Sequence, residues 1–187
     1  MINQRNVLFA GTLALALGTA PLALAQNDQN GQMQQQNQQQ EKMTPENFVD
    51  GASAIHSGEL DAAEMALDKD DISSETRQLA ERIQKDHTQA NQKLEKLAES
   101  KDLDLSATAN LTSLAGAPEL MVEDGNSFDS DFAALQVDAH KEALEFFQRA
   151  ANTLQDQELK QYASDALPNL QEHLEMAQAL QKQVANQ

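Results

Sequence analysis

Four stretches of this 187-residue sequence carry apolar residues at steps of three, four and seven, the spacing that places them on one face of an α-helix. The spacing predicts helices over residues 46–68, 74–100, 128–153 and 157–186. Seven Gly, four Pro, one Tyr and no Trp also disfavour a turn-rich β-sandwich or barrel. The fold is therefore predicted to be all-α.

The links between the predicted helices indicate how they are arranged. Residues suited to helix N-termini stand at the expected starts, namely Thr44-Pro45, Ser73 or Ser74, Ser127 and Asp156. The first and last links are short, whereas roughly 25 residues join the second and third helices. One long crossover between helices 2 and 3 is typical of a ferritin-like four-helix bundle. A helical hairpin that dimerises is the alternative, but each apolar stripe is wide enough for a single shared core.

The first 25 residues are predicted to be a signal peptide. Arg5 is the only charged residue before an apolar run at residues 7–20, and Ala23-Leu24-Ala25 offers a small-x-small cleavage pattern. The run of about 14 residues is shorter than the roughly 20 needed to span a bilayer. We therefore expect cleavage after Ala25 and export. The periplasm is the favoured location, with outer-membrane association or secretion as alternatives.

A Gln/Asn-rich leader is predicted between the signal peptide and the folded domain. Of the 15 residues 26–40, 12 are Asn or Gln. Such a tract buries too little apolar surface to offset the entropy of ordering. The domain plan is thus a signal peptide at 1–25, a disordered leader at 26–43 and a four-helix domain at 44–187.

Composition narrows the classes of function. With 30 Asp+Glu against 13 Lys+Arg the formal charge is −17, which disfavours binding to nucleic acids and to anionic membranes. The absence of Cys excludes disulfides, iron–sulfur clusters and thiol catalysis. The sequence also has no phosphate-binding loop and no His-Glu-x-x-His pair. We therefore lean against an enzyme and against stable membrane insertion after signal cleavage. The protein partner and the oligomeric state are left open.

One ionisable residue interrupts each apolar stripe, and all four lie near the midpoints of their predicted helices. They are Glu59, His87, His140 and His173. His56 lies near the same level, three residues from Glu59, so the two can share a helix face. Such residues cost several kcal/mol in a hydrocarbon core unless they are paired.

Three interpretations of these residues remain open. They could bind a divalent metal, such as zinc, copper, iron or manganese. They could instead form a metal-free hydrogen-bonded cluster, or some could lie at the edge of the core. The metal-free cluster is narrowly favoured. A di-iron centre is disfavoured, because no carboxylate lies three residues before His87, His140 or His173.

Several separated motifs occur in the order seen in a known bacterial family. They are Gly58-Glu59, Ala62-Ala63, Leu67, Asp86-His87-Thr88, Phe128-Asp129, the helix around His140, Leu167-Pro168 and His173-Leu174. The chain resembles exported ferritin-like proteins of unknown function, often labelled outer-membrane proteins. The resemblance implies a ferritin-like four-helix fold and an exported location, and it supplies no established activity.

Two functions from different classes follow. The leading one is a non-enzymatic exported bundle with a structural, stress-protective or partner-binding role. The other is a periplasmic metal-binding or metal-dependent protein that uses Glu59, His87, His140 and His173, with His56 as a further candidate.

Overall fold

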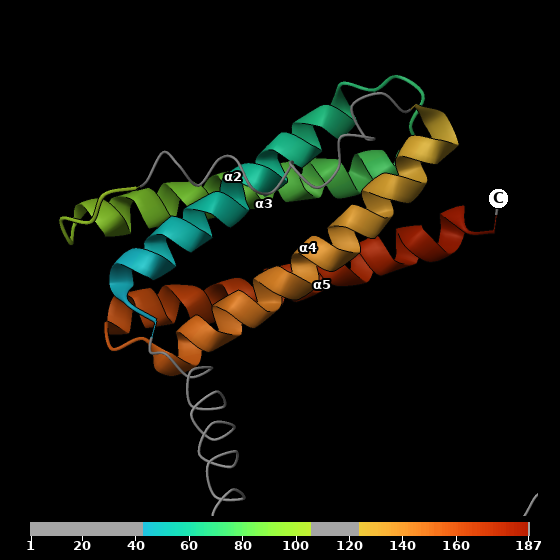
Figure 1. Cartoon of the computed structure of the whole chain (residues 1–187). Coiled ribbons are helices and arrows are strands. Elements are labelled where there is room, and N and C mark those ends of the chain that lie inside the picture. Colours follow the sequence, from blue (N-terminus) through green and yellow to red (C-terminus); the bar gives the residue numbers. More distant parts are fainter. Residues whose placement is uncertain (1–42, 106–123, 187) are drawn as a thin grey trace, which may run out of the picture. The chain divides into compact units, whose positions relative to one another are not determined.

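The computed structural model of this protein describes residues 43–105 and 124–186, which belong to one unit, Lys42–Gln187. These residues form the helices α2 (Pro45–Leu67), α3 (Ser74–Glu99), α4 (Gly125–Thr153) and α5 (Gln157–Val184), drawn in Figure 1. The predicted all-α four-helix bundle is confirmed. The predicted signal peptide, almost all of the leader and most of the crossover lie outside the described residues.

Side-chain caps begin three of the four described helices. Thr44 accepts a hydrogen bond from the Asn47 N–H at 3.2 Å, with Pro at the first helical position. Ser73, rather than Ser74, caps α3 by accepting from the Thr76 N–H at 3.1 Å. Asp156 accepts from two N–H groups at the start of α5. These three predicted caps are confirmed, and each satisfies a backbone donor that the helix leaves free.

The predicted start of α4 is wrong. Ser127 was expected to be its cap, but α4 begins at Gly125 and Asp124 is the N-cap residue. Gly125 has a φ of 61°, a left-handed conformation that glycine adopts without a Cβ penalty. The chain therefore enters the helix earlier than the apolar pattern indicates. An ion pair of 3.1 Å between Lys69 and Asp124 holds this start against the α2–α3 link.

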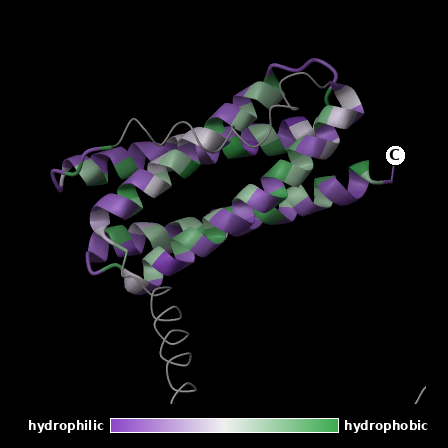
Figure 2. Ribbon diagram, viewed as in Figure 1, coloured by the Kyte–Doolittle hydropathy of each residue, from purple (hydrophilic) through white to green (hydrophobic). Residues whose placement is uncertain are grey.

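The helices pack as two hairpins, α2 with α3 and α4 with α5. The hairpins meet mainly along α3 and α5, whereas α2 and α4 approach each other less closely. Hydrophobic and hydrophilic segments alternate along every helix in Figure 2, as expected of amphipathic helices in a bundle. No helix among the described residues is long and apolar enough to cross a membrane.

The described helices bury two clusters of apolar residues. One surrounds Ile83, Phe132 and Leu180, and the other surrounds Phe48, Leu94 and Phe147. Along each helix, the polar residues singled out in the sequence lie between the parts that contribute to the two clusters. A buried polar layer therefore separates the two halves of the core.

Asp129 gives one sequence motif a structural role. Its side chain is 1% exposed, and its two carboxylate oxygens accept from the Ser73 N–H at 3.0 and 3.2 Å. The neighbouring Phe128 stacks on Phe132, with ring centroids 5.7 Å apart. The Phe128-Asp129 motif thus joins the start of α4 to the start of α3.

Candidate metal centre

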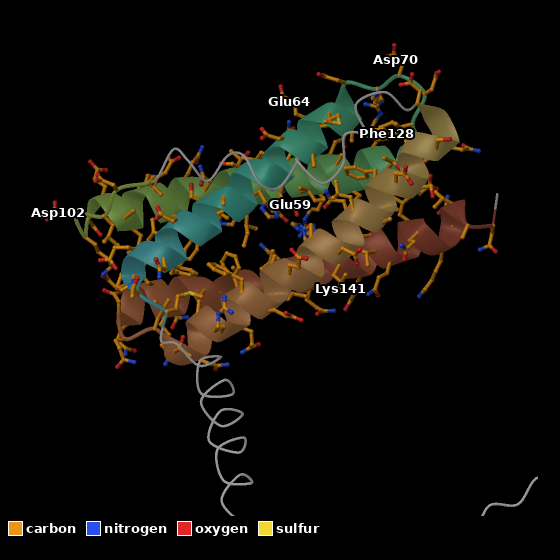
Figure 3. All side chains as sticks on the ribbon, viewed as in Figure 1. Glu59, Glu64, Asp70, Asp102, Phe128 and Lys141 are labelled. Carbon is orange, nitrogen blue, oxygen red and sulfur yellow. The ribbon has the colours of Figure 1, made fainter. Side chains whose placement is uncertain are left out.

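Each helix contributes one buried histidine to the middle of the bundle. His56 comes from α2, and His87, His140 and His173 come from α3, α4 and α5. None of the four is more than 2% exposed. One ring nitrogen from each of His87, His140 and His173 lies within 4.8 Å of the other two. The buried Glu59 also lies near the middle of the bundle, as Figure 3 shows.

Hydrogen bonds at the edge of the cluster assign the proton of His87. The Tyr162 hydroxyl donates its one proton to the Ala90 carbonyl at 3.1 Å. Its oxygen must therefore accept from Nε2–H of His56, which lies 2.6 Å away. Nδ1 of His56 then carries a lone pair and accepts from Nδ1–H of His87 at 3.0 Å. This series of hydrogen bonds leaves the lone pair of His87 on Nε2.

The protons of His140 and His173 are assigned in the same way. Nδ1–H of His140 donates to the Gln136 carbonyl at 3.0 Å, so its lone pair is on Nε2. Nε2–H of His173 donates to a carboxylate oxygen of Asp86 at 3.1 Å, so its lone pair is on Nδ1. These two unprotonated nitrogens lie 3.2 Å apart. No hydrogen remains to join them, and two facing lone pairs repel.

The same separation suits a shared cation. Two nitrogens that ligate one tetrahedral zinc ion at about 2.05 Å lie about 3.3 Å apart. The nitrogens of His140 and His173 are therefore already spaced as two ligands of one metal. Together with His87 they supply three neutral imidazole donors, each oriented by a hydrogen bond from its other nitrogen, as is usual for metal-bound histidines.

Asp86 is held in its ionised form. Burial raises its pKa, but the hydrogen bonds from Arg82 and His173 outweigh burial, so the pKa of Asp86 is lowered overall. Arg82 donates to Asp86 at 2.5 Å and to Glu172 at 2.9 Å. The carboxylate therefore acts as a fixed acceptor for the His173 ring.

Burial keeps the imidazoles neutral. Loss of hydration lowers the pKa of His56 and of His140 to about 4 and that of His87 well below its ordinary value. Burial also lowers the pKa of His173, although the hydrogen bond to Asp86 opposes it. All four rings are therefore neutral at pH 7, the form in which imidazole binds metals.

Glu59 lies beside His140 but on its protonated side. The nearer carboxyl oxygen is 3.7 Å from Nδ1 of His140, whereas the lone pair is on Nε2. Among the residues that the structure describes, the other oxygen, Oε2, has no hydrogen-bond partner, and neither has the side-chain amide of Gln136. Burial raises the pKa of Glu59 to about 8, and the nearby Gln136 amide opposes this shift without reaching hydrogen-bond geometry. Both residues line a cavity of about 350 Å³ between α2 and α4.

The structure thus groups the candidate residues unequally. It brings ring nitrogens of His87, His140 and His173 within 4.8 Å of one another. His56 and Glu59 lie outside this group: His56 contacts Nδ1 of His87, and Glu59 approaches Nδ1 of His140. Asp86 and Tyr162 were not predicted to be site residues. Two signals could have found them: Asp86 directly precedes His87, and Tyr162, the only Tyr, lies in the helical series 159, 162, 166 and 170.

Comparisons with known proteins agree with the fold. CopM in its Cu(II)-bound form superimposes with a TM-score of 0.64 at 16% identity, covering 76% of this chain and 99% of CopM. A DUF305 protein from Streptomyces coelicolor, described as secreted, gives a TM-score of 0.64 at 15% identity and covers 74% of this chain and 91% of its own. No curated protein matches the sequence significantly.

A family model assigns the chain more directly than these structural neighbours do. The model described as "Domain of unknown function (DUF4142)" matches residues 30–180, which is most of the sequence. The protein therefore belongs to the DUF4142 family of domains of unknown function.

Proposed function

We propose that this protein is an exported metal-binding bundle whose ligands are His87, His140 and His173. One observation carries the proposal: hydrogen bonds on the other side of each ring hold the protons of His140 and His173 and leave their unprotonated nitrogens 3.2 Å apart, in a group that a ring nitrogen of His87 joins within 4.8 Å. A divalent cation stabilises such an arrangement, because it replaces lone-pair repulsion with three coordinate bonds.

Copper is the first candidate metal. Imidazole nitrogens suit copper and zinc as well as iron, whereas manganese prefers oxygen ligands. CopM, the fold neighbour, is described in a Cu(II)-bound form. We therefore rank copper before zinc and both before iron and manganese for this site. Holding a metal in this way is a stress-protective role that requires no catalysis.

Export is part of the proposal. It rests on the predicted signal peptide with cleavage after Ala25 and is in keeping with the secreted DUF305 neighbour. The periplasm is the proposed location, where the bundle would meet metals before they reach the cytoplasm.

A metal-free structural cluster is the second candidate. Each of the four rings has a hydrogen-bond partner, and a cluster of buried apolar residues lies on each side of the layer. Such a layer could set the register of the helices without any metal. The two candidates make opposite predictions about chelators.

Thermal unfolding with and without metal separates them. A metal that binds only the folded state stabilises it by about 2.7 kcal/mol at a hundredfold excess over its dissociation constant. Copper or zinc should therefore raise the melting temperature, and a chelator should reverse the rise. His87→Ala, His140→Ala and His173→Ala should each remove this increment, since each deletes one of three ligands.

A buried neighbour provides a matched control. Glu59→Gln alters a residue of the same layer that is not a proposed ligand and makes no hydrogen bond to one. It should retain a metal-dependent increase in melting temperature, even where the metal-free protein is less stable. If chelator and metal leave the wild-type melting temperature unchanged, the structural cluster is the correct account.

A further inference from the structure

The three proposed ligands leave the coordination of a metal incomplete. Zinc and copper take four or more donors in proteins. Glu59 approaches the protonated nitrogen of His140, so it cannot reach the metal without displacing that ring. Both nitrogens of His56 are already engaged, one with His87 and one with Tyr162. The remaining donor must therefore come from outside this set of side chains.

A small cavity lies directly beside the ligands. It has a volume of about 30 Å³ between α3 and α5, and His56, His87 and His173 form part of its wall. Holding one water-sized molecule takes roughly 10–15 Å³ measured in this way. The cavity can therefore hold a small ligand beside the rings of His87 and His173.

A second cavity adjoins the first. It has a volume of about 120 Å³ and shares Asp86, Ala90, Ala166 and Asn169 with the inner cavity. Its other walls include the exposed residues Gln89, Lys93 and Asp165. The two cavities, which adjoin through the four shared residues, are here named together the α3–α5 passage; their linings extend from exposed side chains to His87 and His173. The short side chains of Ala90 and Ala166 lie where the two cavities meet.

The larger cavity between α2 and α4 does not provide this access. Its volume is about 350 Å³, but its lining contains none of the three ligand histidines. Its buried polar residues are Glu59 and Gln136, which lie on the side of His140 away from Nε2. This cavity is larger than the passage, but only the passage is lined by ligand histidines.

We infer that a metal held by His87, His140 and His173 keeps one coordination position for a small external ligand, which reaches it through the α3–α5 passage. This inference rests on the metal site proposed above. The volume of the inner cavity limits the ligand to a few atoms. The outer cavity carries Asp86 and Asp165 beside Lys93, so the preference for a small anion over a cation comes from the positive charge of the metal itself.

Azide binding to the copper-loaded full chain tests the inference. Azide is a small anion, and its coordination to Cu(II) produces a charge-transfer absorption band. Copper stoichiometry is measured first on the same sample, so that a failure of the metal site is recognised separately. With one copper bound per chain, we expect a new band that grows and saturates with added azide.

Variants locate the route. Ala166→Leu should weaken azide binding by at least about tenfold with copper stoichiometry unchanged, because Ala166 also lines the inner cavity and the longer side chain takes the space that azide needs. Ala90→Leu fills the same part of the passage from α3, and it replaces Ala166→Leu in the experiment if that variant does not fold. Ala139→Leu is the matched control, because Ala139 is also half-buried but lines the α2–α4 cavity. It should leave the azide affinity within about twofold of wild type.

Two results would overturn the inference. A copper-loaded wild type that shows no azide band would mean that the coordination is closed. A band that Ala166→Leu and Ala90→Leu leave unchanged, or that Ala139→Leu weakens equally, would place the open position elsewhere. Absence of bound copper in the wild type would instead refute the metal site itself.

Discussion

The stability of the metal-free protein is expected to reach its maximum near pH 6.5 and to fall on both sides. The histidines cause the fall toward acid. Between pH 6.5 and about pH 4, His56 and His140 are neutral in the folded state but protonated in the unfolded state. The unfolded state therefore binds more protons, and the free energy of unfolding drops by about 1.4 kcal/mol per pH unit for each such group.

Glu59 acts in the opposite direction. Its pKa of about 8 exceeds the ordinary 4.5, so between these values it is protonated in the folded state and ionised in the unfolded state. Its effect lowers the free energy of unfolding as pH rises, again by about 1.4 kcal/mol per unit. Below pH 6.5 the several histidines outweigh this single carboxyl. From pH 6.5 to about pH 8 Glu59 acts without them, and stability declines.

Urea unfolding of the chelator-treated protein at intervals from pH 4.5 to pH 8.5 measures this profile. Glu59→Gln should abolish the alkaline decline, because glutamine does not ionise, and should keep the acid decline. The exposed Glu142→Gln on α4 should leave both limbs unchanged. A profile that rises steadily from pH 6.5 to pH 8 in the wild type would contradict the assignment of Glu59 as a buried neutral acid.

Replacing Asp86 with alanine is expected to weaken metal affinity by about 10- to 100-fold, the usual effect of removing a carboxylate that orients a metal-bound histidine. Asp86 holds Nε2–H of His173 and so keeps the lone pair on Nδ1. Without the carboxylate, the His173 ring can rotate or carry its proton on the other nitrogen. Titration of the protein with copper in competition with a chelator of known affinity gives the change.

Asp165→Ala is the control for this variant. Asp165 lies on the exposed side of α5 and lines the same outer cavity, but its carboxylate accepts from the Gln161 amide and not from a ligand histidine. It should change copper affinity by less than about threefold. Equal losses in the two variants would mean that Asp86 contributes only general negative charge.

The sequence was sufficient to predict the helices because their signals are local. Apolar spacing and side-chain caps place each helix within a few residues, and the heights of the histidines follow from helix length alone. The start of α4 was missed because the conformation of Gly125 depends on its own backbone and is invisible to apolar spacing.

The arrangement within the polar layer could not be predicted in this way. Helical spacing places His87, His140 and His173 at one level but does not fix which nitrogen of each faces inward. The protonated nitrogen of each ring is set by its hydrogen bonds to Asp86, Tyr162 and the Gln136 carbonyl. These bonds depend on side-chain rotamers and on contacts between helices, which helical spacing does not specify. The spacing narrowly favoured a metal-free cluster, whereas the inward lone pairs shift the balance toward a metal.

The most direct test of this account is the protonation of the imidazole nitrogens in the metal-free protein. NMR of the ¹⁵N-labelled chain at pH 7 distinguishes a protonated ring nitrogen from an unprotonated one for each of the four histidines. We expect protons on Nδ1 of His87 and His140 and on Nε2 of His56 and His173. A proton on Nε2 of His140 or on Nδ1 of His173 would join these rings by a hydrogen bond, and would contradict the claim that unprotonated nitrogens converge to bind a metal.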